Sequence, residues 1–100
     1  MTPLTSTQKK HLRGLAHPLK PLIQIGKGGL SSAVEEQLEQ AFNDHELVKI
    51  KFNEYKEEKT ELATTLATAR GGQVVGIVGH VAILFRSHPK PEKRRIVVPA

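Results

Sequence analysis

Residues 22–42, LIQIGKGGLSSAVEEQLEQAF, carry the signals that decide the fold of this 100-residue chain. The first four residues are a short apolar run of the kind found in buried strands. A loop of glycines and lysine follows at 26–29, and Ser31 or Ser32 then offers a helix cap, with a capping-box pattern from Ser32 to Glu35. Apolar residues recur at helical spacing from Val34 to Phe42. The stretch predicts a strand, a tight glycine loop and an amphipathic helix in direct succession.

The segment before this stretch predicts a first helix over residues 6–17. Residues 5–8 match a capping box, and Pro18 cannot continue the helix. The side expected to face the core is apolar and holds Leu12, Leu15 and Ala16. The neighbouring arc of roughly 100°, at 3.6 residues per turn, is basic and holds Lys9, Lys10, Arg13 and His17.

The segment after this stretch predicts four further elements. Residues 47–52 alternate as a strand, with Val48, Ile50 and Phe52 on one face and Lys49 and Lys51 on the other. A third helix is predicted from Tyr55 to Arg70, with Leu62, Leu66 and Ala69 inward and a left-handed cap at Gly71-Gly72. Residues 74–78 and 81–85 predict two strands joined at Gly79-His80 by a type II′ hairpin turn.

The predicted order is therefore αβαβαββ. Each strand–helix–strand unit favours a right-handed parallel crossover, and the last two strands are antiparallel. We expect an α/β fold for residues 1–87: a compact two-layer sandwich in which three helices pack on a four-stranded mixed sheet. Residues 88–100 predict a flexible basic tail with prolines, and residues 96–98 could add an edge strand.

The charged residues are separated along the chain, whose net charge is +5. Residues 1–30 hold five basic and no acidic side chains, residues 31–70 have a net charge of −4, and residues 71–100 have a net charge of +4. This separation indicates one positive face and a polyanionic partner. The alternative is chance clustering on a basic protein.

The composition excludes several classes of protein. With 38% hydrophobic and 25% charged residues, the chain is typical of one globular domain. The absence of cysteine removes disulfides and zinc–thiolate sites and suits a reducing compartment. The first residues lack a signal-peptide pattern, and the apolar runs are too short for a bilayer. We expect a soluble, cytoplasmic monomer without a membrane partner.

The loop of Gly26, Lys27, Gly28 and Gly29 has the chemistry of a phosphate-binding turn. Glycines allow a ligand to approach the backbone amides, and the next helix begins with unpaired N–H groups. A Walker A loop would need serine or threonine at position 28, and a dinucleotide fingerprint would need glycine in place of Ser31. The Gly-x-x-Gly pattern that clamps nucleotide backbone in KH domains does match. The alternative is a strand-to-helix turn without a ligand.

No pattern indicates catalysis or metal binding. The five histidines lack metal-ligand spacing, and the acidic residues of the second and third helices indicate solvated faces. The phenylalanines fall on apolar faces, so a sheet that stacks bases is not expected. We expect no cofactor, no metal, no catalytic residue and no small-molecule substrate.

Several blocks together resemble a known family. They are residues 12–21, residues 25–30, residues 45–49, and residues 79–86. The pattern is similar to the CRM domain (chloroplast RNA splicing and ribosome maturation) over roughly residues 4–87, and to the bacterial single-domain YhbY-like proteins. The resemblance implies a fold like the C-terminal domain of translation initiation factor three. It also implies RNA binding and association with precursors of the large ribosomal subunit.

Three hypotheses follow. The first is a non-catalytic RNA-binding protein of ribosome assembly whose partner is ribosomal RNA of the large-subunit precursor. The expected phosphate contacts are Lys9, Lys10, Arg13, Lys20, Gly26, Lys27, Gly28, Gly29, Lys49, Lys51 and Arg86. The second is a protein-interaction module that uses its acidic helix or a sheet edge. The third, a small-molecule phosphate enzyme, lacks a general base and a metal site.

Overall fold

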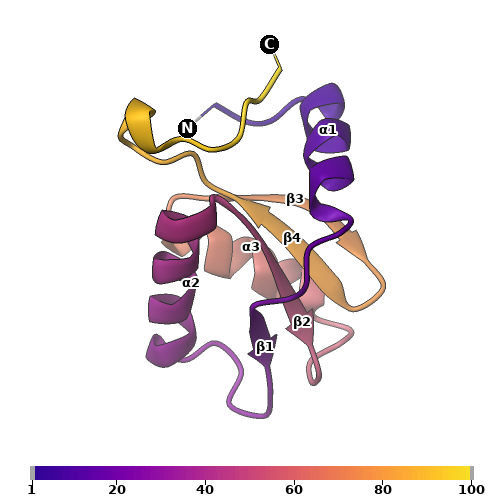
Figure 1. Ribbon diagram of the computed structural model, residues 1–100. Helices are drawn as coiled ribbons and strands as arrows, with labels where there is room; N and C mark the ends of the chain where they lie inside the picture. Colours follow the sequence, from indigo (N-terminus) through magenta and orange to yellow (C-terminus); the bar gives the residue numbers. More distant parts are fainter. Residues whose placement is uncertain (1, 100) are drawn as a thin grey trace.

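The computed structural model describes residues 2–99 and has the predicted order of helices and strands (Figure 1). Its elements are α1 (Ser6–Ala16), β1 (Ile23–Ile25), α2 (Ser32–His45), β2 (Leu47–Phe52), α3 (Lys59–Ala69), β3 (Gln73–Val78), β4 (Val81–Phe85) and a 3₁₀ turn, η1 (Pro91–Lys93). The strands form one mixed sheet in the order β1-β2-β4-β3. The prediction of an α/β fold with three helices and a four-stranded mixed sheet is confirmed.

The sheet combines one parallel pair with two antiparallel pairs. β1 pairs parallel to β2, whereas β4 pairs antiparallel to both β2 and β3. The hairpin between β3 and β4 turns at Gly79, whose φ of +60° is the left-handed conformation expected there. A bulge near Val75 shifts the register of β3 against β4. The last strand thus lies in the middle of the sheet, between β2 and β3.

Residues of β2 alternate between the two faces of the sheet. Val48, Ile50 and Phe52 are buried in the core under α2 and α3, which we call the helical face. Leu47 lies on the opposite side, in a second core with Leu12 of α1. We call this side the open face, because α1 covers only one end of it (Figure 1).

Local capping agrees with the sequence in most places. Thr5 forms the predicted capping box with Gln8, and Ser31 rather than Ser32 caps α2 by accepting a hydrogen bond from the N–H of Val34. After α3, Gly71 has a φ of +71° and the N–H of Gly72 donates to the carbonyl of Ala67, as in a Schellman motif.

Three details of the predicted helices are wrong. α3 begins at Lys59 and not at Tyr55, because Tyr55 has a φ of +56° that no helix interior accommodates. Ala69 is exposed, and Ala63 is buried in its place. In α1, Leu15 is not part of the core either and is 42% exposed.

The C-terminal segment is packed on the domain, contrary to the predicted flexible tail. The carboxylate of Glu46, which is 1% exposed, accepts hydrogen bonds from the backbone N–H groups of His88 (2.7 Å), Arg95 (2.6 Å) and Ile96 (3.1 Å). Ile96 and Val98 pack against the core under α1, but residues 96–98 do not form a strand. If the segment detached, all three hydrogen bonds would break, and the carboxylate of Glu46 would have no partners unless it became exposed to water. The buried carboxylate therefore holds the segment on the domain.

Candidate nucleic-acid interface

The glycine loop between β1 and α2 is open to solvent. The N–H of Gly29 donates to the carbonyl of Gly26 at 3.0 Å and closes a turn, in which Gly29 has a φ of +62°. A Cβ added to Gly26 or Gly28 would meet no atom within 4 Å. Among the hydrogen bonds of residues 2–99, none uses the backbone N–H of Lys27 or Gly28 as a donor. The turn therefore presents free amides beside the exposed side chain of Lys27.

The turn is held by the segment that connects β2 to α3. The hydroxyl of Tyr55 donates to the carbonyl of Lys27 at 2.7 Å, and its ring lies against Gly29, where a Cβ would be 3.5 Å away. The N–H groups of Asn53 and Glu54 donate to the carbonyl of Ile25. Sequence patterns did not single out Tyr55 for this role, because the contact joins residues 28 positions apart.

One side of the turn is acidic and the other is basic. Glu54, Glu57 and Glu58 line a shallow hollow together with Lys27. On the open face, Lys51 lies opposite Gln24 of β1, three residues before Lys27. An anion would therefore approach the turn from the side of the open face.

Lys49 continues the basic surface along β2 towards α1. It lies on the open face two residues from Lys51, about 7 Å away along an extended strand. Its Nζ donates to the carbonyls of His17 (3.3 Å) and Leu19 (3.0 Å), at the exit of α1. These bonds fix the ammonium group at the junction of the sheet and α1.

The basic residues of α1 extend the same surface at the far end from the loop. The Arg13 side chain lies across β3 at the bulge, where a Cβ on Gly76 would come within 2.9 Å of its Cδ. Lys10 and Lys20 are exposed and Lys9 is half-buried. In Figure 1 the loop lies at the bottom of the molecule and α1 at the top, so β2 with its two lysines connects them. The cations form a track along the molecule and not a compact patch.

The guanidinium of Arg86 is used inside the protein and does not face this track. It forms a bidentate pair with Glu39 at 2.8 and 2.9 Å and donates to the carbonyl of Arg70 and the side chain of Asn43. It also stacks on the ring of Phe42, 4.9 Å from the centroid. Its hydrogen bonds lower the pKa of Glu39 below the usual value. The guanidinium of Arg86 thus joins α2, α3 and the end of β4, and these internal contacts, not the predicted phosphate contact, occupy it.

Besides Glu39, one titratable group among the described residues has a shifted pKa. The pKa of His80, in the hairpin turn, is lowered by desolvation and by the nearby charges of Lys59 and Lys56. In residues 2–99, histidine, aspartate and glutamate side chains do not gather in threes around a possible metal position. No described helix combines the length and hydrophobicity needed to cross a membrane.

The arrangement of residues has a counterpart in known proteins. The family model of the CRS1/YhbY (CRM) domain matches residues 4–86. The chain belongs to the CRM domain family. The match includes the glycine loop, α1 and the whole sheet, and it ends before most of the packed C-terminal segment of this CRM domain.

Relatives of this CRM domain are named as RNA-binding proteins. It is 36% identical over 87 residues to an RNA-binding protein of Haemophilus influenzae, covering 86% of this chain and 88% of the relative. It is 35% identical over 91 residues to a probable RNA-binding protein of Pseudomonas aeruginosa, covering 90% and 88%. The solution structure of a candidate RNA-binding protein of Staphylococcus aureus matches this chain with a TM-score of 0.80 at 33% sequence identity. The match covers 97% of this chain and 100% of the Staphylococcus aureus chain.

Proposed function

We propose that this CRM domain is a non-catalytic RNA-binding protein of the cytoplasm that grips the phosphate backbone. The strongest support is the open turn at Lys27. Its free amides lie at one end of the sheet face that carries Lys49 and Lys51. Amides and cations at a helix N-terminus suit phosphate oxygens. The acidic surfaces of α2 and α3 lie on the opposite, helical side of the sheet and do not oppose the polyanion.

The proposed contacts are Lys9, Lys10, Arg13, Lys20, Lys27, Lys49 and Lys51 with the backbone of Gly26, Gly28 and Gly29. The deep, narrow major groove of an A-form RNA helix is closed to side chains, so we expect these groups to contact phosphates, and backbone contacts carry no sequence information. Binding should therefore depend on RNA shape and charge. If about six phosphates are neutralised, the logarithm of the association constant falls against the logarithm of salt concentration with a slope of roughly −4 to −5.

The decisive variant is Lys27→Glu, compared with Lys56→Glu as a control. Both substitutions change the charge by the same amount close to the loop, but Lys56 lies on its acidic side. Lys27→Glu should weaken binding to structured RNAs of different sequence alike and flatten the salt slope by about one. Filter binding or fluorescence anisotropy at several salt concentrations measures both quantities. A slope near zero, or equal effects of the two substitutions, would contradict the proposal.

We further propose that the RNA is ribosomal RNA in precursors of the large subunit. This step is supported by the resemblance of the chain to the CRM family and not by a feature that distinguishes one structured RNA from another. Crosslinking in cells followed by sequencing of the attached RNA tests it directly. We expect fragments of large-subunit ribosomal RNA to dominate, and co-sedimentation of the protein with large-subunit precursors. A predominance of messenger or transfer RNA would contradict the assignment but not RNA binding itself.

A further inference from the structure

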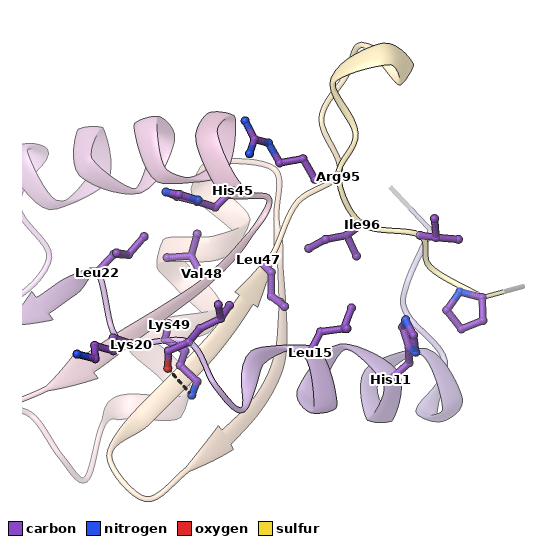
Figure 2. Close-up of a pocket in the computed structure, with 13 residues that line it drawn as sticks. His11, Leu15, Lys20, Leu22, His45, Leu47, Val48, Lys49, Arg95 and Ile96 are labelled. Carbon is purple, nitrogen blue, oxygen red and sulfur yellow. Dashed lines mark hydrogen bonds between the residues drawn. The ribbon is translucent and has the colours of Figure 1, made fainter.

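A long apolar groove runs between α1 and the packed C-terminal segment (Figure 2). Its volume is about 670 Å³, within the range of sites that bind ligands. Its walls are the side of α1 that carries His11 and Leu15, the linker to β1, the end of α2 at His45, the start of β2 and the C-terminal segment. The apolar side chains that form them include Leu15, Leu19, Leu22, Leu47, Ile96 and Val97.

The groove gathers most of the large apolar side chains that the described residues leave exposed. Of six such side chains in residues 2–99, four line it: Leu15, Leu19, Leu22 and Val97. Leu22 is 56% and Val97 is 83% exposed. Single exposed apolar residues are ordinary, but a contiguous patch of them marks a surface that another molecule covers.

The edge of the groove is cationic. Lys20, Lys49 and Arg95 line it, and its lining residues include no aspartate or glutamate. One of these cations is held in place, since the Nζ of Lys49 donates to the carbonyls of the α1 exit. At Arg95 it is the backbone N–H, and not the guanidinium, that the buried carboxylate of Glu46 holds. The same carboxylate also accepts from the backbone N–H of Ile96, so Glu46 positions the backbone of this wall.

The lining favours an apolar protein side chain over a nucleobase. Aliphatic residues form most of the walls, and no phenylalanine, tyrosine or tryptophan lines them. Two histidine rings, His11 on α1 and His45 at the end of α2, also line the groove, but they lie far apart at its two ends and do not form one stacking platform (Figure 2). The polar edge of a base would enter with few partners, and an unpaired polar group is costly to bury. Aliphatic or aromatic side chains of a peptide enter such a groove without that cost.

We propose that this groove docks an acidic protein segment, with its apolar side chains between α1 and residues 95–97 and its carboxylates on Lys20, Lys49 and Arg95. The partner is defined by charge complementarity: apolar anchors interrupted by aspartate or glutamate. Because Lys20 and Lys49 also belong to the proposed RNA track, the segment and RNA compete for these two cations. The binding of the segment does not itself depend on RNA binding.

The test begins with peptides selected from a random display library on the full chain. We expect the selected sequences to be enriched in acidic and large apolar residues. Fluorescence anisotropy then measures the affinity of the tightest peptide for three variants. Leu22→Gln and Lys20→Glu should each weaken it about tenfold or more, which corresponds to about 1.4 kcal/mol. Val78→Gln, at an equally exposed apolar site outside the groove, should not change it.

Leu22→Gln separates this proposal from RNA binding, because it removes no charge. It should leave RNA affinity and the salt slope unchanged. Selected peptides without acidic enrichment, an absence of binders, or equal binding to Leu22→Gln would overturn the proposal. Two other occupants of the groove would also overturn it. A second copy of the chain would double the molecular mass at high concentration, and Leu22→Gln would restore the monomer. RNA bases in the groove would shift the methyl NMR signals of Leu22 and Ile96 in an RNA titration.

Discussion

Replacing Glu46 with alanine removes the group that attaches the C-terminal segment to the domain. The carboxylate is 1% exposed and accepts three backbone N–H bonds, at 2.7, 2.6 and 3.1 Å, from residues more than 40 positions away. Alanine leaves these three donors facing an apolar space. The segment then either stays in place with unpaired N–H groups or detaches and hydrates them.

The size of the effect follows from these two outcomes. Hydrogen bonds to a charged group contribute about 1.5–3 kcal/mol each, so the loss with the segment in place would be about 4.5 kcal/mol or more. Detachment is the cheaper outcome because water satisfies the freed donors, and it limits the loss in the free energy of unfolding to about 2–4 kcal/mol.

A second variant at the same position separates the side chain from the backbone. Glu46 has a φ of +62°, which disfavours any residue except glycine. Glu46→Gly loses the same three bonds but relieves the backbone, so it should be more stable than Glu46→Ala by about 1 kcal/mol. This difference checks that the alanine effect comes from the carboxylate and not from the turn.

Urea unfolding and amide hydrogen exchange measure the two consequences. In Glu46→Ala we expect the amides of Arg95 and Ile96 to exchange at least about tenfold faster, while amides of β2 and β4 keep their protection in proportion to global stability. Unchanged protection at these two amides, together with a stability loss below about 0.5 kcal/mol, would refute the reasoning.

Two further predictions concern packing and an ion pair. Gly72→Ala should lower the free energy of unfolding by about 1–3 kcal/mol, because the added Cβ would lie 2.7 Å from the Phe42 ring. Gly14→Ala, in open space within α1, should instead raise the free energy of unfolding by about 0.5–1 kcal/mol. Thermal unfolding distinguishes the two variants, and equal effects would contradict the packing around Gly72. A double-mutant cycle of Glu39→Gln and Arg86→Gln should give a coupling of about 1 kcal/mol at neutral pH. Since the folded pKa of Glu39 is lowered, this stability is present above the unfolded pKa and is lost as pH falls through the folded pKa; a coupling that is the same at pH 7 and in strong acid would exclude the ion pair as its source.

Helix α3 illustrates how far local patterns define the elements. Its C-terminal end was predicted correctly, because the Gly71-Gly72 cap is a signal within the segment itself. Its start was predicted four residues early. Tyr55 leaves the helical conformation to place its hydroxyl on the carbonyl of Lys27, and this contact between distant segments has no local signature.

The candidate interface was predictable in its loop and strand but not in all of its charges. The glycine turn at Lys27 and the outward direction of Lys49 and Lys51 follow from residue type and from the period of two in a strand. The sequence did not predict that Arg86 pairs with Glu39. The position of its side chain depends on the packing of α2 against β4, which brings together residues 47 positions apart.

The amino-acid sequence by itself determined the order of the helices and strands, the buried face of β2, the glycine turn between β1 and α2 and the separation of charge along the chain. These properties depend on periodicity, caps and composition within short segments. Only the tertiary structure decided that α1 lies on the open face, that Glu46 holds the C-terminal segment against it, and that an apolar groove with a cationic edge forms between them. The reason is that a buried carboxylate takes its partners from whichever distant backbone N–H groups the packed chain brings within hydrogen-bonding distance, and no local pattern encodes that choice.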